Sequence, residues 1–152
     1  MSAPTPARRK MLIASAGAAT VAATAASARA ATAREPVRVV YHITQGNAQA
    51  SRAMSNVRNH LAADPTAKIV VVGNGDGIEF LLNGAKDALG AAYAGNVGDL
   101  ANRGVSFRAC ANTLSSRHIS PDRVLLDATT VPSGVVEVAD LQFRQGYAYI
   151  SP

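Results

Sequence analysis

One predicted strand without polar side chains limits the folds that this chain can adopt. The run Ile69-Val70-Val71-Val72 is continuous and β-branched, so both faces of the strand that it forms must be covered. Burial on both faces is typical of parallel sheets, whose successive strands are joined by crossover segments, usually helices. The residues around this run should therefore supply helices for both sides of a sheet.

Strand and helix patterns alternate along the chain. Apolar or β-branched runs bounded by turn residues predict strands at 37–43, 68–72, 105–110, 128–131 and 147–150. Helical spacing predicts helices at 46–64, 78–86 and 134–145, a helix ending at Gly104, and one or two turns at 112–118. Ser120-Pro121-Asp122 is a further helix start, and Ser133 is the expected cap of the last helix. This order predicts an α/β fold, a three-layer α/β/α sandwich with a mostly parallel five-stranded sheet.

The N-terminal segment resembles an export signal. Arg8, Arg9 and Lys10 precede an apolar run from Met11 to about Ala26, and Ala28-Arg29-Ala30 offers a cleavage site. The run is rich in Ala and Gly and is weaker than the roughly 20 strongly apolar residues of a membrane span. We expect a twin-arginine-type signal at 1–30, a linker at 31–36, a domain at 37–152 and a periplasmic or otherwise exported product. An uncleaved anchor is the alternative; after cleavage no membrane span is expected.

Charge and cysteine content narrow the classes of partner. Removal of the signal takes away four of the 15 basic residues and leaves 11 against 10 acidic ones, scattered along the chain. Nucleic acid is therefore not an expected partner, since binding it needs clustered Lys and Arg. Cys110 is the single cysteine, so no intrachain disulfide can form. Stability must come from packing, and oligomerisation is expected to add to it.

Ligands of open parallel sheets bind beyond the carboxyl ends of the strands. The candidate site residues at those ends are His42, Asn74, Gly75, Cys110, Asn112, Thr113, Ser133 and Gly134.

Cys110 carries the most specific chemistry in this set. It lies where a strand gives way to a helix start, an environment that stabilises a thiolate, and Arg108 on the same strand face adds a positive charge. The alternative is a small buried hydrophobic residue, the role of most free cysteines. His42 is either a base or proton donor near the thiol or a structural side chain at a strand end. Both alternatives stay open at this point.

Other site types lack their motifs. His60 and His118 make no metal-ligand spacing with a carboxylate or with Cys110, so no metal is expected. The turn Gly73–Gly77 lacks the last glycine of a dinucleotide fingerprint and the Lys-Ser/Thr pair of a P-loop. Ser133 has no nucleophile-elbow context. No cofactor is expected.

Several segments together resemble the DsrE/DsrF-like family over residues 37–151. They are Val40–Ile43, Lys68–Val72, Gly77–Leu82, Gly84–Asp87, Gly104–Leu114 and Val131–Val135. The resemblance implies a flavodoxin-like three-layer fold that assembles into dimers, trimers or hexamers. It also implies a cysteine near the third strand that carries persulfide sulfur in the sulfur-relay members, and Cys110 matches that position.

The leading hypothesis is an exported sulfur carrier in which the Cys110 thiolate accepts sulfane sulfur as a persulfide. Asn112 and Thr113 would shape its loop, His42 would lie nearby, and the sulfur donor or acceptor would be a protein or a small sulfur species. The alternative is a non-catalytic oligomeric module that binds a small ligand and whose cysteine only packs. A hydrolase or redox enzyme has no triad, metal set or Cys-x-x-Cys pair to support it.

Overall fold

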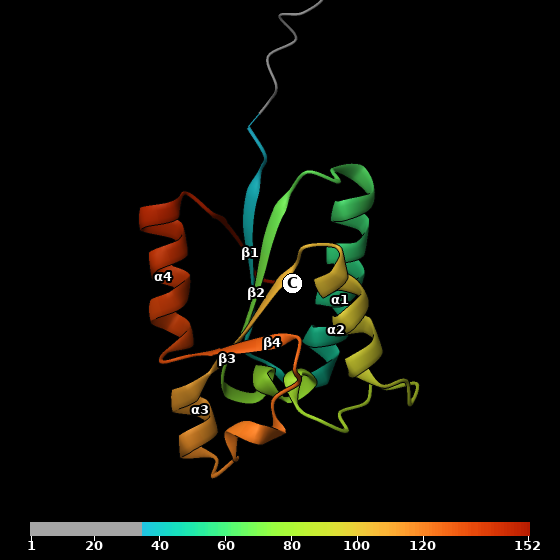
Figure 1. The fold of residues 1–152 in the computed structure, drawn as a ribbon, viewed down its shortest axis with the longest axis vertical. Coiled ribbons are helices and arrows are strands. Elements are labelled where there is room, and N and C mark those ends of the chain that lie inside the picture. Colours follow the sequence, from blue (N-terminus) through green and yellow to red (C-terminus); the bar gives the residue numbers. More distant parts are fainter. Residues whose placement is uncertain (1–34) are drawn as a thin grey trace, which may run out of the picture. The chain divides into compact units, whose positions relative to one another are not determined.

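A five-stranded parallel sheet forms the centre of the structure, a computed structural model that describes residues 35–152 (Figure 1). The strands are β1 (Arg38–Ile43), β2 (Lys68–Gly73), β3 (Ser106–Cys110), β4 (Ala128–Val131) and β5 (Ala148–Ile150). Their spatial order is β4-β3-β2-β1-β5, and all four pairings are parallel. The expected signal at 1–30 and most of the linker lie outside the described residues.

Helices cover both faces of the sheet (Figure 1). On one face lie α1 (Gly46–Ala63), α2 (Tyr93–Asn102) and the 3₁₀ helix η2 (Gly75–Leu81); on the other lies α4 (Gly134–Gln145). Strands β1, β2 and β3 advance in one direction across the sheet, so right-handed crossovers place their helices on one side. The connection from β4 to β5 runs the opposite way and places α4 on the other side. The expected three-layer α/β/α arrangement is confirmed.

The sequence left the strand order open. The order 4-3-2-1-5 differs from the 2-1-3-4-5 order of flavodoxin, although both sheets have helices on both faces. Short α3 (Ala111–Ser116) and the single 3₁₀ turn η3 (Pro121–Arg123) connect β3 to β4 near the carboxyl edge of the sheet. No helix within residues 35–152 is long and apolar enough to cross a membrane.

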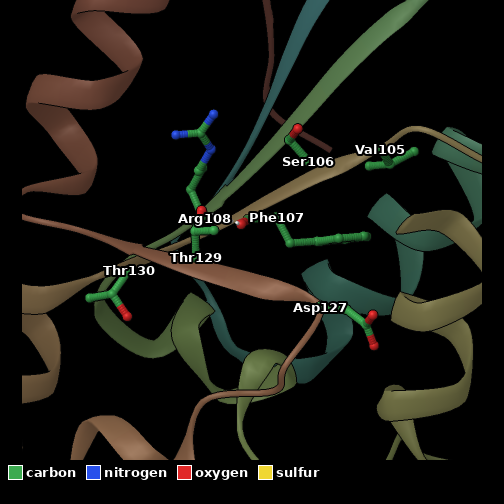
Figure 2. Close-up of a pocket in the computed structure, with 7 residues that line it drawn as sticks. All are labelled: Val105, Ser106, Phe107, Arg108, Asp127, Thr129 and Thr130. Atoms are coloured by element: carbon green, nitrogen blue, oxygen red, sulfur yellow. Dashed lines mark hydrogen bonds between the residues drawn. The ribbon is translucent and has the colours of Figure 1, made fainter. Parts of the chain in front are cut away.

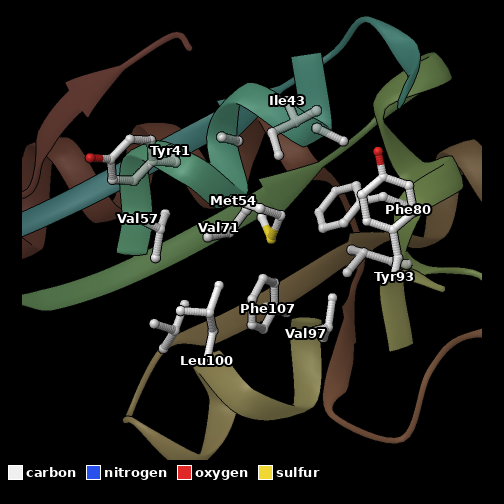
Figure 3. Packing of buried hydrophobic residues seen from close by; sticks show 14 of the residues in the cluster. Tyr41, Ile43, Met54, Val57, Val71, Phe80, Tyr93, Val97, Leu100 and Phe107 are labelled. Atoms are coloured by element: carbon white, nitrogen blue, oxygen red, sulfur yellow. The ribbon is translucent and has the colours of Figure 1, made fainter. Parts of the chain in front are cut away.

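The strands are buried on both sides, as the run at 69–72 predicts. Ile69 and Val71 pack with α1 and α2 around Met54, Phe80 and Phe107, and Figure 3 shows this cluster between sheet and helices. The alternate residues of β1 and β2 pack instead against α4: Val40, Val70 and Val72 with Val138 and Leu141.

The segment after β2 departs from the expected helix at 78–86. The structure has 3₁₀ helix η2 at Gly75–Leu81, because the chain leaves the helix at Leu82 to bridge Val124 and Gly84 adopts φ +86°. A close backbone approach fixes the start of η2, since a Cβ on Gly77 would overlap the Ile43 carbonyl. Helix α2 then begins at Tyr93, so it includes the last three residues of the expected loop at 87–95.

Two serines expected to cap helices do so only by position. Ser120 precedes η3 and Ser133 precedes α4, but neither side chain makes a capping hydrogen bond. The helix expected after Ser120 is a single 3₁₀ turn. Gly104, by contrast, has φ +90° two residues after the end of α2, as its predicted left-handed role requires.

Candidate functional site

Cys110 is the last residue of β3 and the residue that precedes α3. Only 4% of its surface is exposed, and it is the free cysteine of the chain. Alternation along β3 places it on the face of the sheet that α4 covers, because Phe107 and Ala109 belong to the core on the opposite face. The thiol therefore lies between the sheet edge and the first turn of α4.

Gly134 makes this close packing possible. A Cβ on Gly134 would lie 3.0 Å from the Cβ of Asn74, 3.3 Å from that of Cys110 and 3.4 Å from a methyl of Val72. The glycine backbone at the start of α4 therefore approaches both Asn74 and Cys110. A larger residue would push the helix away from the thiol.

Two opposing effects act on the Cys110 pKa. Burial raises it, but hydrogen bonding from the Thr113 hydroxyl and from the backbone N–H groups of Gly134, Thr113 and Asn112 outweighs burial, so the pKa of the thiol lies below its ordinary value. These donors favour the thiolate over the neutral thiol, so they lower the pKa. The arrangement favours a thiolate in a nearly buried position.

The Thr113 hydroxyl is itself held by the glycine turn. Gly75 N–H donates to Thr113 Oγ1 at 3.0 Å, and Thr113 is only 8% exposed. Gly75 has φ +56°, a conformation that glycine adopts without strain. The turn after β2 and the helix after β3 are therefore joined beside the thiol.

His42 lies on β1 and reaches this region through Asn74. Its Nε2 is 2.8 Å from Asn74 Oδ1, and its Nδ1 is 3.1 Å from the hydroxyl of Tyr149 on β5. An amide oxygen can only accept, so Nε2 carries a hydrogen and, in the neutral ring, Nδ1 accepts from Tyr149. Both ring nitrogens are thus occupied, and Asn74 stands between His42 and the surroundings of Cys110.

Arg108 does not supply the charge that its place on the strand suggests. Its guanidinium pairs with Glu137 of α4, with 3.3 Å between Nη1 and Oε1, and hydrogen-bond donors rather than this cation lower the Cys110 pKa. Arg108 and Phe107 leave β3 in different directions (Figure 2). Both residues line a cavity of about 340 Å³. Cys110 does not line that cavity.

Five of the predicted site residues lie together, and a sixth is joined to them by a hydrogen bond. Cys110, Thr113, Gly75, Asn74 and Gly134 lie together, and His42 joins them through Asn74.

Two predicted residues take part only through their backbone. Asn112 N–H donates to the carbonyl of Pro132 at 3.2 Å and also lies beside the sulfur. Ser133 accepts the N–H of Glu137 with its carbonyl, and its hydroxyl makes no capping bond. Among residues 35–152, no group of three or more His, Cys, Asp or Glu side chains is placed to hold a metal ion.

Sequence reasoning missed Tyr149 as a partner of His42. Tyr149 is the partner of Val40 across the β1–β5 pair, and His42 lies two residues after Val40 on the same face of β1. The rings of Tyr149 and His42 therefore meet, with ring centroids 5.7 Å apart. The pairing of β5 with β1 depends on the return of the chain across the sheet, which no local pattern encodes.

Comparison with known proteins places the chain in a family. Solved structures similar to it include MTH1491 from Methanobacterium thermoautotrophicum, a protein of unknown function, with 34% identity and a TM-score of 0.68 over 76% of this chain and 99% of that one. The ychN protein from E. coli has the same fold, with 14% identity and a TM-score of 0.60 over 77% and 97% of the two chains. A search of curated proteins gave no match.

The model of one family covers nearly the whole sequence. The DsrE/DsrF-like family matches residues 13–152, which include every residue of the site described above. The chain therefore belongs to the DsrE/DsrF-like family, which is related to sulfur-relay proteins.

Proposed function

We propose that this protein is a sulfur carrier in which Cys110 accepts sulfane sulfur as a persulfide. The observation that carries the proposal is a set of uncharged donors that favours the Cys110 thiolate: the Thr113 hydroxyl and the N–H groups of Gly134, Thr113 and Asn112. The chain also belongs to a family that is related to sulfur-relay proteins. The donors lower the thiol pKa without a neighbouring cation. Thiolate is the form that attacks sulfur.

The proposed step balances without an added oxidant. The Cys110 thiolate attacks the outer sulfur of a donor persulfide, R–S–SH, so a bond forms between Sγ and that sulfur while the S–S bond of the donor breaks. The donor leaves as the thiolate R–S⁻, and the proton stays on the transferred sulfur. An acceptor thiolate later removes the outer sulfur by the same displacement, which returns Cys110 to thiolate.

The remaining residues of the site have supporting roles in this proposal. Asn74 and Cys110 both pack against Gly134, and His42 holds the Asn74 carboxamide through its Nε2–H. His42 acts on Asn74 and not on Cys110 itself, since both of its ring nitrogens are bonded elsewhere. The near burial of Cys110 favours a narrow donor, such as a polysulfide or a persulfide at the tip of a chain.

Two further parts of the proposal concern the setting in which the carrier works. The arginine pair at Arg8-Arg9 supports export by the twin-arginine pathway, so the donor and acceptor would be exported proteins or small sulfur species. The outer face of α4 supports self-association, because Val135, Val136 and Phe143 are exposed there.

Intact-mass measurement tests the carrier function. Protein lacking residues 1–30, as wild type and as Cys110→Ala, is incubated with polysulfide and freed of excess reagent. We expect the wild type to gain whole sulfur atoms that a reductant removes, and the alanine variant to gain none. The chain has one cysteine, so wild type alkylated beforehand is a second control for sulfur bound elsewhere.

The opposite result would replace this function. If wild type gains no sulfur and its native thiol resists alkylation, Cys110 is a packing residue. The alternative of a non-catalytic binding module would then account for the fold.

A further inference from the structure

A second group of contacts, outside the site itself, holds α3 on the glycine turn. Arg117, directly after α3, places Nη2 2.9 Å from Glu79 Oε1 and Nη1 3.8 Å from Asp76 Oδ1. Nη1 also donates to the carbonyl of Gly75 at 3.4 Å. The two carboxylates belong to η2, so one guanidinium bridges the segments that follow β2 and β3.

The N–H and the carbonyl of Gly75 are thus both bound by side chains of the segment that follows Cys110. Its N–H donates to Thr113 Oγ1 at 3.0 Å and its carbonyl accepts from Arg117. Thr113 and Arg117 are four residues apart, a spacing that puts two side chains on the same face of a helix. Thr113 and Arg117 therefore bind the same residue of the turn, Gly75, from one face of the helix.

The bond from Gly75 determines the direction in which the Thr113 hydroxyl donates its hydrogen. A hydroxyl carries one hydrogen, and Thr113 Oγ1 already accepts the Gly75 N–H, so that hydrogen must be donated away from Gly75. Thr113 lies three residues after Cys110 in the chain and is nearly buried. The Thr113 hydroxyl lowers the pKa of the Cys110 thiol, so the thiolate is the acceptor that this hydrogen serves.

We propose that Arg117 is a positioning residue for sulfur acceptance: by binding Glu79 and Gly75 it keeps α3 on the turn and the Thr113 hydroxyl on the Cys110 sulfur. The inference rests on the proposed function of Cys110. Arg117 acts through position and not through its charge, because its guanidinium is engaged by two carboxylates. The same hydroxyl would donate a hydrogen bond to the Cys110 thiolate each time the persulfide gives up its outer sulfur.

The pH dependence of alkylation tests this directly. The rate of reaction with iodoacetamide, measured from pH 5 to pH 10 on the chain without residues 1–30, gives the thiol pKa without any sulfur donor. We expect Thr113→Val to raise that pKa by about one unit, because a hydrogen bond to an ion is lost, and Thr113→Ser to restore it. Arg117→Gln and Glu79→Gln should each raise it by about half a unit, and the double variant by no more than either alone.

The control breaks an ion pair of similar kind elsewhere. Arg144→Gln removes the 2.8 Å pair with Asp140 on α4 and should leave the thiol pKa unchanged. High salt should raise the wild-type pKa towards that of Arg117→Gln and leave the Arg117→Gln value in place. Thermal unfolding of each variant shows that the fold is retained.

Two outcomes would overturn the inference. One is a thiol pKa that stays at the wild-type value in folded Thr113→Val; the other is an Arg117→Gln pKa equal to that of Arg144→Gln. Failure of the carrier function has a different signature: the pKa would move as expected while polysulfide added no sulfur to Cys110.

Discussion

The Cys110 thiol differs from an ordinary buried cysteine in what surrounds it. A thiol packed only against apolar groups has a raised pKa and stays neutral, whereas here four donors outweigh the cost of burial. Arg108, the cation on the same face of the strand, is bound to Glu137 and is not among the groups that lower the pKa. The folded state therefore binds the Cys110 proton more weakly than the unfolded chain does.

This difference predicts a pH-dependent contribution to stability. Because the folded pKa lies below the unfolded value, near 9.0, folded Cys110 loses its proton first as the pH rises. The free energy of unfolding of wild type, minus that of Cys110→Ala, should thus rise with pH between the two pKa values and be flat below the folded one. Urea unfolding with a reductant, at intervals from about pH 6 to pH 9, measures it. Parallel curves for the two proteins would contradict the lowered pKa.

The site could be predicted from sequence only where local patterns encode it. Cys110, Asn74 and Gly134 each end a strand or start a helix, so the rule for parallel sheets brought them to one edge. Tyr149 and Arg117 could not be found this way. Their partners, His42 and Glu79, are 107 and 38 residues away in the chain, and only the strand order brings them together.

Among the elements, the turn between β1 and α1 is tied to the C-terminus by one buried side chain. Gln49 Oε1 accepts the N–H groups of Thr44 and Gln45, both at 2.8 Å. Its Nε2 faces Ser151 Oγ and Pro152 O, just beyond β5, at 3.4 and 3.3 Å. Strand β5 has three residues, so this link helps to hold an edge that carries Tyr149.

Removal of that amide should destabilise the protein. In Gln49→Leu the two N–H groups lose their acceptor within a nearly buried turn, a loss that we expect to cost about 2 kcal/mol of unfolding free energy. Gln142→Leu, an exposed glutamine on α4, is the matched control and should change stability by less than about 0.5 kcal/mol. Urea midpoints give both values. Equal midpoints for the two variants would show that water replaces the lost acceptor.

The elements themselves divide in the same way into those set locally and those set by packing. The helix at 134–145 and the strand at 128–131 were predicted with their observed bounds, because Gly, Pro and apolar period all agree there. The expected helix at 78–86 was wrong beyond Leu81. Its apolar period is real, but Leu82 leaves it for the bridge to Val124, a contact 42 residues away.

In the described domain as a whole, the two faces of the sheet are covered unequally. Helices α1 and α2 with η2 pack on one face, whereas α4 alone lies on the other. The outer side of α4 carries Val136, Ala139 and Phe143 at spacings of three and four, around a depression of about 260 Å³ that Asp140 and Arg144 also line. Phe143 is 92% exposed. An exposed apolar stripe of this kind suits an isologous contact, in which the same patch meets itself across a two-fold axis.

Self-association through α4 is the expected consequence. Two antiparallel copies of α4 that place Phe143 of each near Val136 of the other would meet around Ala139, whose small side chain allows close approach, while Asp140 keeps its 2.8 Å pair with Arg144 of the same helix. Sedimentation of the chain without residues 1–30 should show oligomers, and Phe143→Ser should weaken the association by about 30-fold, the effect of losing a central aromatic contact. Leu89→Ser, equally exposed but remote in sequence from α4, should behave as wild type. A wild type that stays monomeric at high concentration, or a Leu89 variant that dissociates as readily, would show that copies do not meet at this face.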